Sequence, residues 1–396
     1  MNILQIPRGV LLGLAFAAAP PAAAAPYVPG DDALVLETLP GKRADPATAE
    51  LRRLRAAAVV APDSADAAER LARRYFDLAM EEGDPRYVGY AQAVLRRWPE
   101  TAATPPDILV LHGKLRQYRH DFARAMADFD LALQADPAHF GARAWRHAIL
   151  MVQADYAGAR RECSLLAPHA TELQAAACLA YVDATTGNAR AAYGRLSAAL
   201  ARDAETDPGH RLWVQTRLAE MAWRFGDLAA AERHFRAGLD LGINDNFILA
   251  AYADFLLEQG RAAETLALLG NWARSDTLLL RLALAARQLK RPEGEKHART
   301  LGERFADAAL RGEKLHLQEE ARYLLELKGD ARAALAAAAE NYRGQREPRD
   351  ALVLIEAALA ARAPATAAPA LQWLESSGFE SKRLRDAAAQ LKALKP

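Results

Sequence analysis

The chain has 396 residues and almost balanced charge, with 51 lysines and arginines against 50 aspartates and glutamates, and a formal net charge of +1. Proteins that bind nucleic acid usually carry a clear basic excess, so the balance argues against that class of partner. The length would allow two or three ordinary domains, but no long linker interrupts residues 66–396. We therefore expect one continuous domain over that range.

The N-terminus has the three parts of a secretory signal peptide. Arg8 precedes an apolar run of 11 residues at 9–19, and a stretch of prolines and alanines follows. The run is too short to span a bilayer, and the order of charge, apolar core and small residues is that of an export signal. We predict a signal peptide over 1–25, cleaved near Ala24 or Ala25, and a periplasmic or secreted bacterial protein. An uncleaved anchor or an N-terminal helix of the fold is the alternative.

The sequence after this signal contains no feature that would attach the protein to a membrane, so we predict no membrane span and no lipid anchor. The first cysteine is Cys163, which leaves no site for a lipid anchor near the N-terminus, and no later apolar stretch is long enough to cross a bilayer. Residues 26–65 are rich in proline and are predicted to form an extended lead segment. Within it, 33–39 could pack as a short strand or helix on the first element of the fold.

Residues 106–137 carry the pattern of two short helices packed together. Ala125, Phe129 and Ala132 recur at i, i+4 and i+7, which is the spacing of one helix face. Small residues such as Gly113 and Ala125 let two helices approach closely. We expect Phe129 to fill the gap between successive units.

This pattern returns about every 34 residues. Ala125 recurs as Ala159 and Gly226 as Gly260, in each case 34 residues further on. A fixed period of this length predicts stacked helical hairpins, because one hairpin alone cannot bury both of its apolar faces. The turn inside a hairpin is clearest at 226–227, where glycine accepts a positive φ and aspartate can cap the next helix.

The repeat resembles the tetratricopeptide repeat, or TPR, most strongly at 106–137 and well at 212–270. The resemblance implies an all-α, TPR-like α-solenoid, which is a right-handed superhelix of stacked helical hairpins. It would cover 66–396 and end in a C-terminal capping helix. Further units in the same phase lie at 69–99, 140–167, 173–201 and 315–342, and units at 277–310 and 349–375 rest mainly on spacing.

The two cysteines are predicted to form a disulfide. Cys163 takes the place of Phe129 in its repeat, and Cys178 lies early in the first helix of the next unit. An oxidising compartment favours a bridge between two cysteines placed in this way. The alternative is a pair of buried small hydrophobic residues. A reactive C-x-x-C motif is absent from the sequence, which argues against a redox enzyme.

The sequence contains none of the familiar catalytic or cofactor-binding motifs. It has no H-E-x-x-H, G-x-S-x-G, P-loop or G-x-G-x-x-G. The nearest approach to a metal-ligand set is His316 with Glu319 and Glu320 on one helix, a pattern that is more often a solvated polar patch. We expect a protein that is not an enzyme and has no catalytic residues, no cofactor and no metal.

The TPR resemblance also implies where a partner would bind, since the first helix of each TPR hairpin lines the concave groove. Aromatic and charged side chains together suit a peptide or a glycan, and aromatic residues are enriched at protein interfaces. Some aromatic residues at such positions, Trp213 and Phe247 among them, could instead belong to the core between repeats. The residues predicted to line the groove are Lys114, Tyr118, Tyr181, Glu220, Trp223, Asp254, Arg281, His316, Glu319 and Tyr323.

The whole chain is also similar to exported bacterial TPR proteins, through residues 251–261, 316–330 and 341–351. These observations predict a non-catalytic, periplasmic or exported interaction scaffold that binds a protein or peptide partner in the groove. The identity of the partner does not follow from the sequence. The alternative is a protein that binds an envelope polysaccharide or a glycan precursor.

Overall fold

The computed structural model describes residues 31, 46–204, 206–313 and 316–394. The chain divides into two units, residues 1–49 and residues 50–396. The predicted signal peptide and most of the predicted lead segment lie outside the described residues. No helix among the described residues is both long and apolar enough to cross a membrane.

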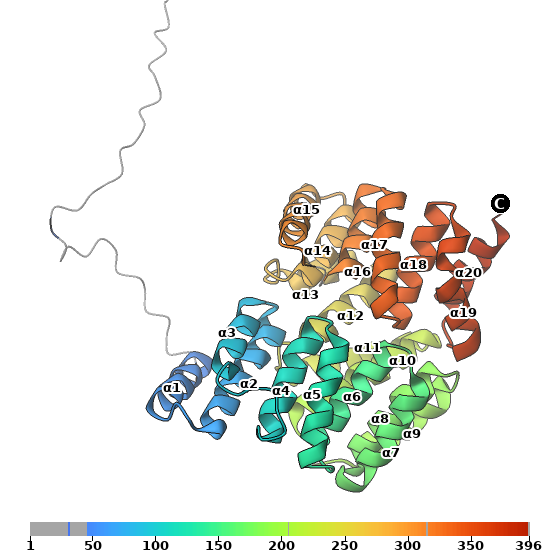
Figure 1. Cartoon of the computed structure of the whole chain (residues 1–396). Coiled ribbons are helices and arrows are strands. Elements are labelled where there is room, and N and C mark those ends of the chain that lie inside the picture. The colour runs from blue at the N-terminus through green and yellow to red at the C-terminus, as the bar shows by residue number, and fades with distance from the viewer. Residues whose placement is uncertain (1–30, 32–45, 205, 314–315, 395–396) are drawn as a thin grey trace, which may run out of the picture. The chain divides into compact units, whose positions relative to one another are not determined.

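The second unit is an all-α, TPR-like solenoid in which successive helices pair as antiparallel hairpins (Figure 1). Over the described ranges the chain forms helices and turns and no strand. The helices of the first half are α1 (Pro46–Val60), α2 (Ala65–Glu82), α3 (Arg86–Leu95), α4 (Pro106–Tyr118), α5 (Phe122–Ala135), α6 (Phe140–Val152), α7 (Tyr156–Leu166), the 3₁₀ turn η1 (Ala167–His169), α8 (Glu172–Thr185) and α9 (Ala189–Arg202).

The second half continues the same pairing, with the hairpins close to the repeat units predicted from the sequence. A six-residue π-helix, η2, extends α16 before the next turn. The helices are α10 (Pro208–Arg224), α11 (Leu228–Leu239), α12 (Asn246–Glu258), α13 (Ala262–Leu269), α14 (Asp276–Gln288), α15 (Glu293–Leu310), α16 (Leu317–Arg322), η2 (Tyr323–Lys328), α17 (Ala331–Gly344), α18 (Pro348–Ala360), the 3₁₀ turn η3 (Pro364–Ala367), α19 (Ala368–Ser377) and α20 (Lys382–Ala393).

The hairpin of α4 and α5 shows how the repeat pattern produces close packing. Phe129 is completely buried, as are Ala125 and Ala132 on the same face of α5. Its ring lies against Gly113 of α4, where an added Cβ would come within 2.3 Å of the ring. Only glycine fits at that position. The ring of Phe129 therefore requires a glycine at position 113.

The turn inside each hairpin needs one residue with a positive φ. Gly226 has φ 85°, and the Asp227 side chain then accepts a hydrogen bond from the backbone N–H of Ala230 at 3.0 Å. The corresponding turns at His120 and Ala154 adopt φ of 60° and 62° without a glycine. A residue with a Cβ is strained in this region, so tertiary packing fixes the hairpin geometry even where the local sequence disfavours it.

The predicted extended lead segment is wrong for its last part, because residues 46–60 form helix α1. Leu51, Leu54 and Ala58 follow helical spacing and pack against the apolar cluster of α2 and α3. The prolines upstream suggested an extended chain, but the stretch from Pro46 onward is rich in alanine, leucine and arginine. Those residues favour a helix.

Hairpins far apart in the sequence also contact one another within the second unit. The Asn246 side chain donates a hydrogen bond to the carbonyl of Met80 at 2.9 Å, which joins α12 to α2. The Trp373 indole donates to the Tyr156 hydroxyl at 2.7 Å, which joins α19 to α7. The solenoid therefore folds back on itself, and its last hairpins lie against its middle (Figure 1).

Candidate functional site

The concave face predicted to receive a partner is partly occupied by the chain itself. The short segment 345–349, which connects α17 to α18 and includes the first two residues of α18, crosses the turns and first helices of earlier repeats. The Gln345 side chain lies 3.2 Å from Nδ1 of His120. The backbone N–H of Arg346 donates to the carbonyl of Val152 at 2.7 Å. A stretch of this chain therefore takes a place that an open groove would offer to another molecule.

The end of this segment is held by a group of stacked aromatic and basic side chains. The Phe247 ring is contacted by two guanidinium groups, that of Arg217 at 4.5 Å and that of Arg349 at 4.9 Å. The Tyr181 hydroxyl donates to Glu347 at 3.3 Å, and the Arg217 guanidinium also lies 4.8 Å from the Tyr181 ring. Cation–π contacts are strengthened when desolvated, so this group holds α18 against α8, α10 and α12.

Beyond this segment the groove remains hollow. An inner cavity of about 290 Å³ lies between α10 and α12 on one side and α18 and α20 on the other. An outer cleft of about 620 Å³ lies beside it, along α12, α14, η2 and α20. Four side chains line both spaces: Asp254, Glu258, Arg322 and Arg383.

Arg383 of α20 links the two sides of the hollow. Its guanidinium contacts Glu258 of α12 at 3.4 Å and Glu356 of α18 at 2.9 Å. Glu258 in turn accepts a hydrogen bond from the Trp223 indole at 3.3 Å. Trp223 is half-buried and packs edge-on against Phe255. This tryptophan thus offers part of its ring to the inner cavity while its polar edge is held in place.

A carboxylate between two arginines forms the floor shared by the cavity and the cleft. Asp254 accepts hydrogen bonds from Arg281 at 2.7 Å and from Arg322 at 3.0 Å. Burial alone would raise the pKa of Asp254, but the two guanidinium groups outweigh it and lower the pKa to about 2. Arg281 is only 4% exposed. The floor is therefore ionised and rigid, and it suits recognition better than proton transfer.

Arg224 lies at the α8 end of the inner cavity. It donates to the carbonyl of Ala184 at 3.2 Å and stacks on the Phe379 ring at 4.4 Å, while its Nε is buried with no hydrogen-bond partner in the part of the chain that the structure describes. Burial lowers the pKa of Arg224 to about 10. The guanidinium remains charged at neutral pH and places a cation at this end of the cavity, within the influence of the carboxylates of Glu220 and Glu380.

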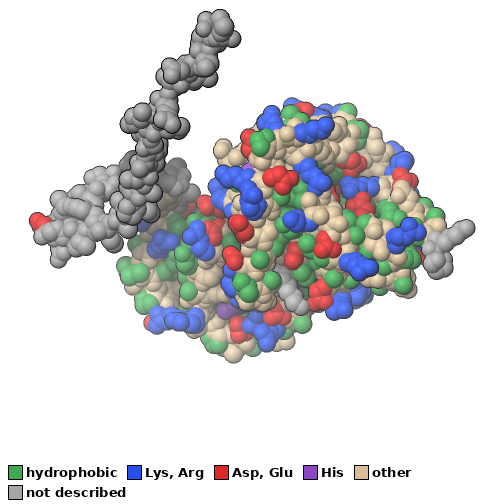
Figure 2. Space-filling model, turned by 90° about the horizontal axis from the view of Figure 1, so that it is seen from above, with side chains coloured by type: hydrophobic (Ala, Val, Ile, Leu, Met, Phe, Trp, Pro, Cys, Tyr) green, Lys and Arg blue, Asp and Glu red, His purple; other side chains and the backbone are tan. Residues whose placement is uncertain are grey.

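Five of the ten residues predicted to line the groove lie together around the inner cavity. They come from α8, α10, α12 and α14, which are first helices of consecutive hairpins, as the TPR register implies. Charged side chains of both signs are interspersed over the face seen in Figure 2. The five residues are Tyr181, Glu220, Trp223, Asp254 and Arg281.

The other five residues lie elsewhere. Lys114 is buried with its ammonium 4.3 Å from the Phe76 ring, and burial lowers its pKa to about 8. Tyr118 is half-buried against the α2–α4 cluster. Tyr323, the first residue of η2, packs in the core against Phe305 of α15.

His316 and Glu319 flank the start of α16, outside the residues that line the two hollows. Glu319 lies 3.6 Å from Arg281 and its pKa is lowered, since Arg281 and other charges outweigh its burial. Among the described residues, His316 and Glu319 do not form part of the cluster with metal-ligand geometry. That cluster consists of His147, Cys163 and Cys178 instead.

Sequence reasoning missed the residues that the C-terminal hairpins bring to the site. Arg349, Phe379 and Arg383 are far in sequence from α10 and α12. No periodicity relates these three residues to the residues of those helices. Arg217 could have been found, since it lies one turn before Glu220 on the same face of α10 and pairs with it at 2.9 Å.

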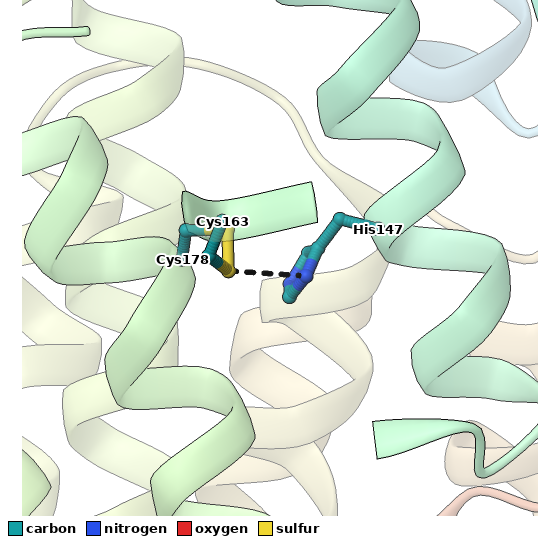
Figure 3. Close-up of side chains that lie close together, drawn as sticks. All are labelled: His147, Cys163 and Cys178. Carbon is teal, nitrogen blue, oxygen red and sulfur yellow. Dashed lines mark hydrogen bonds between the residues drawn. A yellow bond between two sulfur atoms is a disulfide. The ribbon is translucent and has the colours of Figure 1, made fainter. Parts of the chain in front are cut away.

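The predicted disulfide between Cys163 and Cys178 is present and joins α7 to α8. Both cysteines are buried beside His147 of α6 (Figure 3). The two sulfur atoms therefore connect adjacent hairpins, which is the placement that the repeat register implied.

Comparison with known proteins finds solved structures of helical-repeat type at low identity. No family model and no curated protein matches the chain. The chain is similar to a structure of the APC/C hetero-tetramer Cut9–Hcn1, with 13% identity, a TM-score of 0.48, and coverage of 82% of this chain and 63% of that one. It is also similar to the P58(IPK) TPR domain, with 14% identity, a TM-score of 0.23, and coverage of 89% and 94%.

A third similar structure is Naa15/Naa10 bound to HypK-THB, with 13% identity, a TM-score of 0.25, and coverage of 87% of this chain and 63% of that one. The chain thus spans somewhat less than two thirds of the length of the first and third of these chains. At such identities and TM-scores, no partner or activity carries over to this chain.

Proposed function

We propose that this protein is a non-catalytic interaction scaffold that binds a protein or peptide partner in the hollow between α10, α12 and α14 and the C-terminal hairpins. One observation carries the proposal. The outer cleft and the inner cavity share a rigid, ionised floor at Asp254, and Trp223 stands above it with its indole N–H already bonded. Side chains fixed in this way lose little entropy when a ligand binds.

The segment 345–349 restricts the part of the groove in which a partner can bind. Since this segment fills the face near His120, Val152 and Tyr181, a partner would enter from the outer cleft and extend inward. An extended peptide end would place its polar groups near Glu258 and Arg383, which line both the cleft and the cavity. The remaining predicted groove residues, Lys114 and Tyr323 among them, would then act by supporting the fold.

We further propose that the protein is exported and acts in the periplasm or outside the cell. The predicted signal peptide at 1–25 supports this, and so does the disulfide, since such bonds persist in oxidising compartments.

Site-specific photo-crosslinking in envelope extract tests the binding site. A photo-reactive residue at Gln288, which is exposed and lines the outer cleft, should capture a partner, whereas one at the exposed Leu165 of α7 should not. Trp223→Ala should weaken capture by about 10-fold or more, as expected for an aromatic anchor, and Trp223→Phe should weaken it less.

Equal capture from Gln288 and Leu165, or capture unaffected by Trp223→Ala, would place the partner on another face. Retention on immobilised envelope polysaccharide that depends on Trp223, without a crosslinked protein, would instead support the glycan-binding alternative. Circular dichroism of each variant shows whether the helices are retained.

A further inference from the structure

Three potential metal ligands from three successive helices meet in the core of the first half of the solenoid. His147 comes from α6, Cys163 from α7 and Cys178 from α8 (Figure 3). Nδ1 of His147 lies 3.4 Å from Sγ of Cys163, and the three ligand atoms all lie within 4.8 Å of one another. All three residues are buried. The cluster is separate from the hollow described above.

The imidazole ring is held with Nδ1 toward the sulfur atoms. Nδ1 also lies 3.3 Å from the carbonyl oxygen of Ala159 on α7. Nε2 is buried without a hydrogen-bond partner among the described residues. The ring is therefore oriented by its contacts on the Nδ1 side, and that side faces Cys163.

In the disulfide form the sulfur atoms are not available as thiolates. Every chain is made with thiols, however, and the dithiol form would present two cysteine sulfurs and one imidazole nitrogen at the same point. Thiolate and imidazole ligands favour Cu(I) and Zn(II) among common cations. The surrounding residues are apolar or soft, including Met151, Ala159 and Val182.

The number of ligands favours Cu(I) over Zn(II). Structural zinc sites are almost always four-coordinate, whereas this cluster provides three side chains in a place that excludes water. The thioether-bearing Met151 in the same cluster adds soft character. A cation satisfied by two thiolates and one imidazole fits the arrangement best.

We propose that the dithiol form of this protein binds one Cu(I) ion through Cys163, Cys178 and Nδ1 of His147, and that disulfide formation and metal binding exclude each other. Binding displaces the two thiol protons, the imidazole proton moves from Nδ1, where it faces the Ala159 carbonyl, to Nε2 so that Nδ1 presents its lone pair, and the copper stays Cu(I) throughout. Closing the S–S bond removes two electrons from the sulfurs. A disulfide reagent accepts them and becomes two thiols, and the copper ion is released.

A Cu(I) titration of the full chain tests this proposal. A water-soluble phosphine reduces the bond, taking one oxygen from water to become the phosphine oxide while the two sulfurs become thiols. Cu(I) is then added without oxygen in competition with a chromophoric Cu(I) chelator. The reduced chain should take up one ion, X-ray absorption should show both Cu–S and Cu–N scattering, and the oxidised chain should take up none.

The His147→Phe variant separates a three-ligand site from two cysteines acting alone. Its affinity for Cu(I) should fall by about 10-fold or more, and the Cu–N scattering should disappear. The matched control is His169→Gln, which changes an exposed histidine just after α7 and should leave both readouts unchanged. Circular dichroism confirms that each reduced variant is folded.

Two results would overturn the proposal. One is a reduced, folded wild type that leaves all copper with the chelator. The other is His147→Phe binding Cu(I) as tightly as the wild type. If His147→Phe does not fold, Cu–N scattering in the wild type alone decides, and its absence would rule out the histidine ligand.

Discussion

The contacts between neighbouring hairpins and those between distant hairpins differ in chemistry. Neighbouring hairpins meet through apolar side chains, as where Phe129 fills the space against Gly113. Several contacts between distant hairpins are polar, as where Glu347 contacts Tyr181 and Trp373 contacts Tyr156, although Ala154 and Tyr156 also pack against the C-terminal apolar cluster. The apolar contacts supply most of the stability, because burial of apolar area is the main favourable term. The polar contacts join hairpins that are far apart in the sequence.

The largest loss of stability is expected from a substitution that removes a contact between neighbouring helices. Phe129→Ala removes a completely buried ring, and we expect it to lower the free energy of unfolding by about 3–5 kcal/mol. Urea denaturation followed by circular dichroism measures this. Leu165→Ala, at an exposed site on α7, should change stability by less than about 0.5 kcal/mol. Similar stability of the two variants would contradict the packing described here.

An intermediate loss of stability is expected from a substitution that removes the ion pairs between α12 and the helices α14 and α16. Asp254→Asn leaves Arg281 and Arg322 without their carboxylate, and should cost about 3 kcal/mol at pH 7. The folded pKa of Asp254, about 2, is below its ordinary value of 3.8. Its contribution is therefore fully present well above pH 4 and is lost as the pH falls toward 2.

The stability difference between wild type and Asp254→Asn should accordingly shrink by about 2 kcal/mol as the pH falls from neutral toward 2. Asp130→Asn is the control, since Asp130 pairs with Arg146 at the surface and should cost less than about 1 kcal/mol. A difference that does not vary with pH would show that Asp254 is not held ionised by the two arginines.

The smallest loss of stability is expected from a substitution that removes a contact between distant hairpins. Tyr181→Phe removes the hydrogen bond to Glu347 and should lower stability by about 1 kcal/mol. It should also loosen α18, which amide hydrogen exchange of residues 348–360 would detect. The control is Tyr90→Phe, which alters an exposed tyrosine of α3. Unchanged exchange in α18 would show that Glu347 does not need Tyr181 to stay in place.

The difference between contacts of neighbouring hairpins and contacts of distant hairpins also explains which features could be predicted from the sequence. Hairpin stacking follows from a period that recurs along the chain, so Phe129, the Gly226 turn and the cysteine pair could all be placed by register. The link from Asn246 to Met80 joins residues 166 positions apart, and that from Trp373 to Tyr156 joins residues 217 apart. No periodicity relates such residues, so the partial filling of the groove could not be predicted.

For the candidate site, the repeat register placed side chains from consecutive first helices around the inner cavity, and their role in binding stays a prediction. Trp223 and Asp254 were located by register. Tyr323 was expected in the groove, but it lies in the core, at the residue where α16 continues as the six-residue π-helix. A π-helix has no reliable signature in local sequence, since it arises from how the neighbouring helices pack.

The contacts of α12 with α2 and of α19 with α7 also fix the number of repeats. An open solenoid can gain or lose a repeat while each remaining repeat keeps its neighbours. Here, inserting one more hairpin between α7 and α19 would move Trp373 away from Tyr156 by a whole repeat. Duplication or deletion of a repeat, which lets open arrays change length during evolution, would therefore be selected against in this protein. Residues 50–396 should accordingly unfold as one cooperative unit rather than from the ends inward.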